Sequence, residues 1–172
     1  IDHQIQGDDF EVIQVDQTNQ ERVEHILTER SLRFDLIIDD GSHHPSHQIS
    51  SFNQLFPWLK ENGLYIIEDI ETSYWRRGSL YGYPLSYGLR DPWSTVEIFK
   101  QVADLVNRRS LCAQDQSFVA YQLSALGLDV DNLETIHGLH FYPNLIAVRR
   151  LHHAIQEMIK AGSGHPNLIA RL

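Results

Sequence analysis

The sequence has a single cysteine, few basic residues and no long apolar run. With only Cys112, it can form neither a disulfide framework nor a cysteine-based zinc site. Lys and Arg number 14 against 23 Asp and Glu, and a net charge of -9 argues against nucleic-acid binding, which needs a basic surface. No segment approaches the roughly 18 apolar residues of a membrane span, and the polar N-terminus is unlike a signal peptide. We therefore expect a cytoplasmic protein that binds neither nucleic acid nor membranes.

Methionine is also scarce. The chain starts at Ile1 and its only methionine is Met158. The opening segment takes up a structured pattern at once, so the sequence is interpreted as a piece of a longer protein. Its 172 residues and 42% hydrophobic content are still enough for one domain with a core.

Strand and helix patterns alternate through the first half of the chain. Strands are predicted at 10–16, which alternates, and at 33–40 and 64–69, whose continuous apolar runs are typical of strands buried on both faces. Helices are predicted at 18–30, with Thr18 or Asn19 as N-cap, and at 46–63, which ends at Asn62-Gly63 and has an irregular last turn at Pro57. This order predicts an α/β fold with a doubly wound, mostly parallel sheet.

The second half begins with a long segment, 70–93, that is rich in glycine and aromatic residues and lacks periodicity. A loop of this length in a compact domain is usually functional. Helices are predicted at 94–110, capped by Ser94, and at 117–128. Residues 133–150 read as two strands around a turn at 142–144, an antiparallel hairpin at the sheet edge. A last helix, 151–162, and a tail to residue 172 complete the prediction.

Carboxylates gather where two predicted neighbouring strands end. Asp39 and Asp40 close one strand, and Glu68 and Asp69 close the next. Ligands of open α/β sheets bind at this edge, and four like charges there need compensation. A hard cation such as Mg²⁺ would provide it, with Asp40, Glu68 and Asp69 as oxygen ligands. The alternative is that one aspartate caps a helix, another binds loop amides, and the rest are solvated.

Three histidines follow the first carboxylate pair. His43 lies three residues after Asp40, on the turn into the next helix, and is placed to act as a general base on a hydroxyl. His43, His44 and His47 could instead bind zinc by their spacing, although the neighbouring carboxylates suit a harder metal. For His44 a plain surface role is favoured.

Aromatic residues are concentrated in the segment 70–93. Tyr74 and Trp75 are its first two, and four more follow at Tyr81, Tyr83, Tyr87 and Trp93. Their rings either pack this segment onto the sheet edge or bind a sugar ring or flat acceptor.

The stretch FDLIIDDGSHHPSHQISSFNQLFPWLKENGLYIIEDIETSYW, residues 34–75, resembles the core of the class I S-adenosylmethionine-dependent methyltransferases of the macrolide-sugar type. The mycinamicin and tylosin sugar O-methyltransferases belong to this family, and cephalosporin-hydroxylase-like proteins are more distant relatives. The segment HFYPNLIAVRR, 140–150, is similar to the family's closing hairpin, so the match covers roughly residues 10–150.

The resemblance implies S-adenosylmethionine and Mg²⁺ as cofactors and a hydroxylated small molecule as acceptor. By position it assigns Asp40, Glu68 and Asp69 to the metal and His43 to the general base. For the methyl donor it indicates Asp2 at the ribose, Asp16 and Gln17 beside the adenine, and Asp39 along the methionine part. Tyr74 and Trp75 are the candidate substrate contacts.

The sequence departs from the family at its start. The family's first strand and glycine-rich loop are expected upstream of Ile1, because no glycine motif of the form GxGxxG follows a predicted strand. Residues 1–150 would then form a partial catalytic domain, and 151–172 a C-terminal helix and tail. A hydroxylase-like enzyme and a degenerate metal-binding module remain as alternatives. The aromatic loop and the edge hairpin are consistent with a homo-oligomer.

Overall fold

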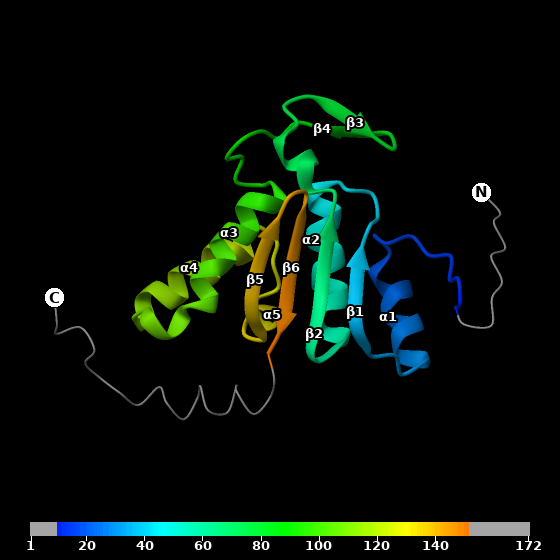
Figure 1. Ribbon diagram of the computed structural model, residues 1–172, viewed down its shortest axis with the longest axis horizontal. Helices are drawn as coiled ribbons and strands as arrows, with labels where there is room; N and C mark the ends of the chain where they lie inside the picture. The colour runs from blue at the N-terminus through cyan, green and yellow to red at the C-terminus, as the bar shows by residue number, and fades with distance from the viewer. Residues whose placement is uncertain (1–9, 152–172) are drawn as a thin grey trace.

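A four-stranded mixed sheet forms the centre of the computed structural model, which describes residues 10–151 (Figure 1). Its order is β1 (Phe34–Asp39), β2 (Leu59–Glu68), β6 (Leu145–Arg150) and β5 (Ile136–Tyr142). The β1–β2 pair is parallel, and β6 is antiparallel to both of its neighbours. The predicted α/β class is therefore confirmed, and β5 and β6 pair as an antiparallel hairpin in the described sheet.

Five α-helices and three short 3-10 helices are described. The α-helices are α1 (Gln20–Glu29), α2 (Pro45–Leu55), α3 (Thr95–Val106), α4 (Ala113–Ala125) and α5 (Val130–Leu133), and the 3-10 helices are η1 (Phe56–Trp58), η2 (Ile70–Tyr74) and η3 (Arg108–Ser110). A small separate hairpin, β3 (Gly78–Leu80) with β4 (Tyr83–Leu85), stands above the strand ends in Figure 1. No helix among residues 10–151 is long and apolar enough to cross a membrane.

The helices begin where polar side chains satisfy free backbone amides. Asn19 Oδ1 accepts a 3.1 Å hydrogen bond from the amide of Arg22, and Ser94 Oγ accepts one of 3.3 Å from the amide of Glu97. Such caps stabilise a helix by about 1 kcal/mol. Both N-caps lie where the sequence predicted them.

The core lies between one face of the sheet and the helices α2 and α3. Phe52 stacks on Phe56 with ring centroids 4.7 Å apart, and it meets Tyr65 and Phe99 edge-on at 5.2 and 5.1 Å. All four rings are fully buried. Burial of such rings provides much of the apolar driving force for folding, so this cluster fixes α2 and α3 against the sheet.

The opposite face of the sheet is exposed at β1 in the described part of the chain. Leu36 and Ile38 of β1 are 48% and 51% exposed, whereas Ile37 between them is buried. The prediction that this strand is buried on both faces is therefore wrong for residues 10–151. A doubly wound sheet has helices on both faces, and the described helices α2 and α3 cover the face of Ile37.

Two element boundaries also differ from the prediction. Residues 11–16 form no strand, and only Phe10 makes an isolated bridge, because no strand of the described sheet lies beside this segment. The helix predicted to reach Asn62-Gly63 ends at Leu55, and η1 contains Pro57, which cannot donate the hydrogen bond that a helix needs. Asn62 has a positive φ of 61° inside β2, where the register against β1 shifts, so this pair makes a strand irregularity.

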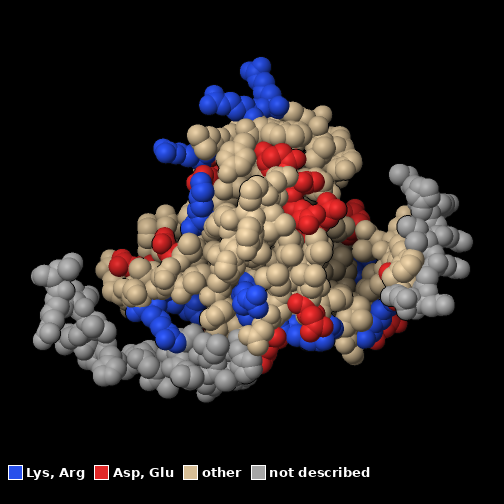
Figure 2. All heavy atoms as spheres, in the orientation of Figure 1, with Lys and Arg blue, Asp and Glu red and all other residues tan. Residues whose placement is uncertain are grey.

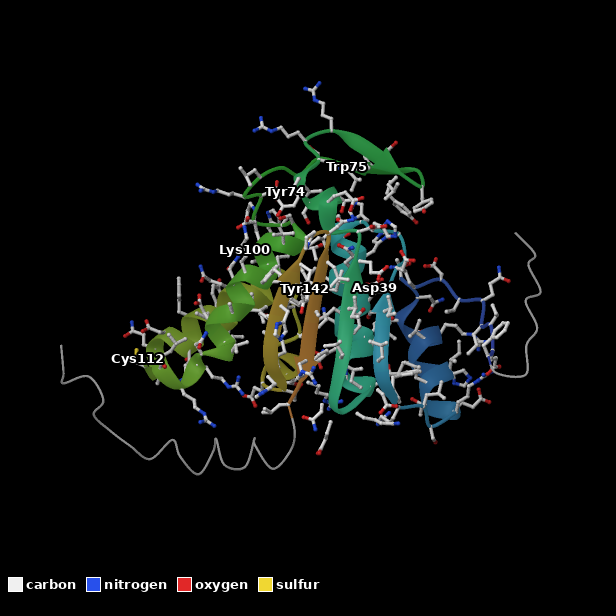
Figure 3. The ribbon with its side chains drawn as sticks, in the orientation of Figure 1. Asp39, Tyr74, Trp75, Lys100, Cys112 and Tyr142 are labelled. Carbon is white, nitrogen blue, oxygen red and sulfur yellow. The ribbon has the colours of Figure 1, made fainter. Side chains whose placement is uncertain are left out.

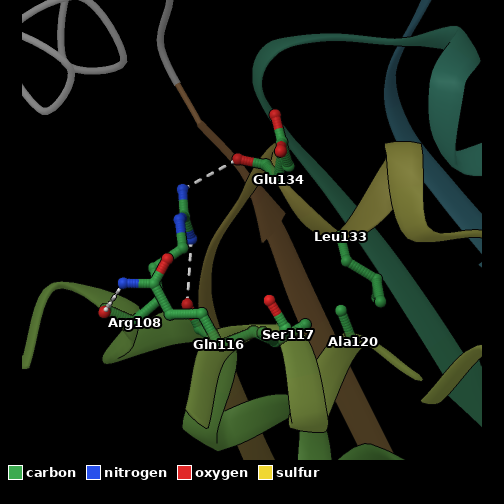
Figure 4. Close-up of a pocket in the computed structure, with 7 residues that line it drawn as sticks. Arg108, Gln116, Ser117, Ala120, Leu133 and Glu134 are labelled. Atoms are coloured by element: carbon green, nitrogen blue, oxygen red, sulfur yellow. Dashed lines mark hydrogen bonds between the residues drawn. The ribbon is translucent and has the colours of Figure 1, made fainter. Parts of the chain in front are cut away.

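A small cavity of about 210 Å³ lies at the far end of α3 from the strand ends (Figure 4). The Arg108 guanidinium beside it donates 2.9 Å hydrogen bonds to the carbonyl oxygens of Leu105 and Glu134. Gln116 in turn donates to the carbonyl of Arg108 at 2.9 Å. These bonds join α3, α4 and the segment before β5, so the residues around this cavity hold the helices together.

Candidate active site at the strand ends

The predicted site lies at the upper edge of the sheet, beneath the β3–β4 hairpin. β1 ends at Asp39 and β2 ends at Glu68, and because the two strands are parallel their following residues emerge side by side. Figure 2 shows acidic atoms gathered at this edge, below the hairpin, with basic side chains projecting from above. The edge is therefore locally negative.

Three side chains meet there. The His43 ring has Nε2 at 3.1 Å from Asp40 Oδ1 and Nδ1 at 3.3 Å from Asp69 Oδ2. One ligand atom from each of the three residues lies within 4.8 Å of the others, which is close enough to share one ion. His43 is largely buried, at 13% exposure, whereas the Asp40 and Asp69 carboxylates are 62% and 42% exposed. The two carboxylates are thus open to solvent, while the imidazole between them is mostly enclosed by the protein.

Strained backbone supports two of these three residues. His43 and Asp69 have positive φ angles of 55° and 52°, a region that non-glycine residues rarely adopt. Such strain costs on the order of 1–3 kcal/mol per residue and tends to occur at functional sites. The two strained residues also contact each other, through His43 Nδ1 and Asp69 Oδ2.

Buried polar side chains, which the sequence patterns did not single out, hold the strained loops in place. Thr72 Oγ1 donates a 2.6 Å hydrogen bond to the carbonyl of His43. Gln48, 1% exposed, donates to the carbonyl of Glu68 at 2.9 Å and accepts from Thr95 Oγ1 at 2.7 Å. These bonds tie the ends of both strands to α2, η2 and α3. Gln48 and Thr72 both lie in the stretch 34–75, but the sequence patterns assigned no role to either of them.

Asn144 connects the site to the β5–β6 turn. Its Nδ2 donates a 2.7 Å hydrogen bond to Asp69 Oδ1, and its Oδ1 accepts one of 2.8 Å from the amide of Glu71. The sequence marked Asn144 only as a turn residue. In the structure it orients the Asp69 carboxylate, and its own φ of 59° is also positive.

Asp39 lies apart from the exposed carboxylates. It is 7% exposed and accepts a 3.3 Å hydrogen bond from the buried hydroxyl of Tyr65. Burial raises the pKa of Asp39 to about 6, although the hydrogen bonds from Tyr65 and the Gly41 amide oppose the shift. Burial and the Asp39 charge also raise the pKa of Tyr65 well above its usual value.

Glu68 is not part of the three-residue group. It is the last residue of β2, partly exposed, and strand alternation puts it on the face of Leu64 and Ile66, opposite to Tyr65 and Ile67. The group that the structure brings together is therefore Asp40, His43 and Asp69, while the predicted metal ligands were Asp40, Glu68 and Asp69.

Three further residues were predicted to contact the methyl donor. Asp16 and Gln17 are described by the structure, and Asp2 lies outside the described residues. Asp16 is exposed, and hydrogen bonds from the Thr18 amide and hydroxyl lower its pKa. Gln17 Oε1 accepts from the Ser42 amide, and its Nε2 donates to Ser51 Oγ, both at 3.1 Å. Gln17 thus supports the turn after β1 with both ends of its amide.

The two predicted substrate contacts belong to the segment after β2. Tyr74 is 46% exposed at the end of η2, and Trp75 lies partly buried against Gly78 at the base of the small hairpin. Tyr83 of the small hairpin packs on two histidines. Its ring centroid is 4.7 Å from that of His47 and 6.1 Å from that of His44. Tyr83 therefore packs as the first interpretation of the aromatic segment predicted, whereas Tyr74 is exposed, and binding of a sugar ring or flat acceptor stays a prediction.

His44 and His47 are engaged in this packing. Ser42 Oγ lies 2.7 Å from His47 Nδ1, and the Ser46 amide donates to His44 Nδ1 at 3.3 Å. Burial, together with the charge of His47, lowers the pKa of His44. The described residues gather no three-histidine metal group.

The donor set of the central group fits a hard divalent cation. Asp40 and Asp69 provide carboxylate oxygens that face solvent, and Mg²⁺ prefers one or two carboxylates with open positions for water or substrate oxygens. Asn144 provides the outer hydrogen bond that commonly orients a ligating carboxylate. The two carboxylates thus suit Mg²⁺, whereas the imidazole of His43 is a less usual ligand for this ion.

No family model matches the chain. Curated relatives do match. The chain is 32% identical over 134 residues to 8-demethyl-8-alpha-L-rhamnosyl tetracenomycin-C 2'-O-methyltransferase of Streptomyces olivaceus, covering 76% of this chain and 28% of that protein. It is 33% identical over 142 residues to mycinamicin VI 2''-O-methyltransferase of Micromonospora griseorubida, covering 80% and 31%.

A solved structure agrees with these relatives. MycE methyltransferase from the mycinamycin biosynthetic pathway, in complex with Mg, SAH and mycinamycin VI, superposes with a TM-score of 0.62 at 27% identity, covering 90% of this chain and 33% of that one. The chain spans about three tenths of the length of the curated relatives it matches. Within that span, it is a homologue of the sugar O-methyltransferases of the mycinamicin and tetracenomycin type.

Proposed function

We propose that this chain forms part of an S-adenosylmethionine- and Mg²⁺-dependent O-methyltransferase that acts on a sugar hydroxyl. The observation that carries the proposal is the meeting of Asp40, His43 and Asp69 on strained loops at the strand ends. The sugar O-methyltransferases that match the chain, and the MycE complex with Mg and SAH, support the same activity. The acceptor would be a sugar or another polyhydroxylated small molecule.

In this proposal Asp40 and Asp69 hold the metal, and Glu68 completes the set. An oxygen ligand suits Mg²⁺ better than the imidazole of His43, and Glu68 is adjacent in sequence to Asp69. When bound, Mg²⁺ would lower the pKa of a coordinated acceptor hydroxyl. Asn144 fixes the orientation of Asp69 through the 2.7 Å bond described above.

His43 would take the proton from the acceptor hydroxyl. Its imidazole is oriented by Asp40 and Asp69, and its backbone is held by Thr72. A neutral imidazole has one lone pair, so one ring nitrogen must turn from its carboxylate to the hydroxyl. The proton would then pass from the hydroxyl oxygen to that nitrogen.

The methyl donor would be positioned by Asp2, Asp16, Gln17 and Asp39. S-adenosylmethionine supplies an activated methyl group, so the protein has mainly to align the acceptor with it. Exposed Asp16 is free to accept further hydrogen bonds, whereas Gln17 acts by supporting the Gly41–Ser42 turn. Tyr74 and Trp75 would contact the acceptor.

We also propose that the sheet is doubly wound. It would then continue beyond β1, with its first strand provided by sequence upstream of Ile1. Support comes from β1, which is an edge strand of the sheet formed by residues 10–151 and has exposed Leu36 and Ile38. Residues 1–150 would form one partial catalytic domain and 151–172 its C-terminal helix and tail, in a cytoplasmic protein that self-associates.

Calorimetric titration of the chain tests this proposal. S-adenosylmethionine is titrated with and without millimolar Mg²⁺, and transfer of a labelled methyl group to a rhamnoside is then measured. The proposal predicts saturable Mg²⁺ binding, binding of the donor, and transfer that EDTA removes. Mg²⁺ binding without donor binding would indicate a metal-binding module instead. Transfer that EDTA does not affect would overturn the metal assignment.

A further inference from the structure

A cavity of about 480 Å³ lies beside the candidate metal site, between η2, α3 and the β5–β6 turn. Its lining includes Glu71, Tyr74, Lys100, Phe141, Tyr142 and Asn144. Figure 3 shows Tyr74, Lys100 and Tyr142 coming from three different elements near the upper edge of the sheet. Of the residues that line the cavity, the chemistry proposed above uses only Tyr74 and Asn144.

One polar atom of this cavity has no partner. Glu71 Oε2 is buried, and no hydrogen bond to it is found among the described residues. Leaving a buried acceptor unpaired is costly, and more so for a charged group. The backbone of Glu71 is fixed by the bond from its amide to Asn144, so its side chain stays beside the cavity. A turn of this side chain toward the cavity would let the unpaired oxygen accept a hydrogen bond from a ligand.

Aromatic rings form a large part of the wall. Tyr74, Phe141 and Tyr142 are 46%, 45% and 57% exposed, which is a large apolar area to leave in water. Flat rings next to a hydrogen-bonding group suit a ligand with one apolar face and polar edges. A sugar ring in its chair form has this character.

The charges of the cavity select a neutral ligand. Lys100 also lines it and is paired with Glu97 at 2.6 Å, which leaves donor capacity on its ammonium. An anionic ligand would meet the Glu71 carboxylate, and a cationic ligand would meet Lys100. A neutral polyol can donate to Glu71 and accept from Lys100.

We propose that this cavity binds a hydroxylated ring, with Glu71 Oε2 accepting a hydrogen bond from one of its hydroxyl groups. Asn144 contacts Asp69 on one side and Glu71 on the other, so the bound ring lies next to the candidate metal site. The ring is then a neighbouring part of the acceptor, adjacent to the ring that is methylated. This last identification rests on the proposed function, whereas the binding of the ring does not.

Saturation-transfer NMR on the 172-residue chain tests the proposal, with methyl α-L-rhamnopyranoside as the probe and no Mg²⁺ or methyl donor present. Glu71→Leu should weaken probe binding by roughly tenfold, as expected for loss of one hydrogen bond to a charged group. Tyr142→Ala should weaken it as well. Glu24→Leu, at an exposed position on α1, is the matched control and should leave binding unchanged.

Thermal unfolding separates loss of binding from loss of fold. Glu71→Leu removes a carboxylate oxygen that is buried without a partner, so the melting temperature of the variant should equal or exceed that of the wild type. Equal probe binding in wild type and Glu71→Leu would overturn the proposal, as would no binding at tens of millimolar probe. Tighter binding of tetramethylammonium than of the sugar would also overturn it, because the cavity would then be a cation site.

A further variant keeps this test distinct from that of the proposed function. Asp40→Asn, at the candidate metal site, should bind the probe as the wild type does. Loss of probe binding in Asp40→Asn would mean that the sugar occupies the metal site and would overturn the cavity assignment. A chain that binds the probe through Glu71 but transfers no methyl group would refute the proposed function alone.

Discussion

The side chain of Asn144 donates a 2.7 Å hydrogen bond to the Asp69 carboxylate, which joins the β5–β6 turn to the loop after β2. These residues are 75 positions apart in the sequence. Because outer-shell hydrogen bonds orient ligating carboxylates, Asn144 should matter for metal affinity although it is not itself proposed as a ligand.

Asn144→Ala should therefore weaken Mg²⁺ binding by about 10- to 100-fold, the usual cost of losing an outer-shell partner. Titration calorimetry with Mg²⁺ measures this directly. Asn107→Ala is the control, because Asn107 Nδ2 also donates a single hydrogen bond, to the carbonyl of Ala103 at the end of α3. Equal Mg²⁺ affinity in the Asn144 variant and the wild type would contradict the role assigned to this residue.

Asp40→Asn should abolish the stabilisation that Mg²⁺ gives while leaving the fold intact. The Asp40 side chain is 62% exposed, so removing its charge costs little folding free energy. The readout is the shift of the melting temperature at increasing Mg²⁺, which bound ligand raises by mass action. Asp35→Asn on β1, 82% exposed and paired with Lys60, is the control and should keep the wild-type shift. An unchanged shift in Asp40→Asn would remove Asp40 from the metal site.

Glu68 and His43 can be distinguished as the third metal ligand. We expect Glu68→Gln to weaken Mg²⁺ binding and His43→Asn to change the Mg²⁺ affinity by no more than a few fold. We also expect His43→Asn to reduce methyl transfer by at least 10²-fold, as for loss of a general base. Parallel calorimetry and labelled-methyl assays on the two variants measure both quantities. The reverse result, with Mg²⁺ binding lost only in His43→Asn, would make the Asp40–His43–Asp69 group itself the metal site.

Tyr81 occupies the tip of the β3–β4 hairpin in a conformation better suited to asparagine or glycine. Its φ is 50°, it is followed by Gly82 with a φ of 84°, and its ring lies 6.2 Å from that of His43. Two-residue hairpin turns with two positive φ angles favour Asn-Gly. Tyr81→Asn should raise the unfolding free energy by about 0.5–1 kcal/mol, because it relieves backbone strain. It should also raise the KM for the acceptor, because it removes a ring that lies beside His43. Chemical denaturation and steady-state kinetics would check both; a lower stability would contradict the strain argument.

The local parts of the fold could be predicted from sequence. The caps at Asn19 and Ser94, the parallel β1–β2 pair and the β5–β6 turn depend on residues that are close together or on strong patterns. The exposure of Leu36 and Ile38 could not be predicted, because a strand pattern does not say which of its faces another element covers. The segment 10–16 has a strand pattern and yet forms no strand in the described structure, since strand formation needs a neighbouring strand.

The site was predictable in its residue types and less so in its contacts. Adjacent parallel strands bring Asp40 and Asp69 together, and this follows from topology alone. The positive φ angles of His43 and Asp69 could not be predicted, because both depend on buried bonds made by Thr72, Gln48 and other distant residues. Glu68 was assigned with Asp69 because they are adjacent, although strand alternation turns it toward the other face of the sheet.

Asp39 should make folding stability depend on pH. Burial raises its pKa from 3.8 to about 6 in the folded state, so between these values the folded protein binds more protons than the unfolded chain. Its contribution to stability is therefore lost as pH rises through this range, and the full penalty of roughly 3 kcal/mol at most is present above pH 6. Asp39→Asn removes the charge. In metal-free buffer, the unfolding free energy of Asp39→Asn minus that of the wild type should increase from pH 4 to pH 7. Urea denaturation at several pH values measures this difference, and a difference that is constant with pH would show that Asp39 does not titrate there.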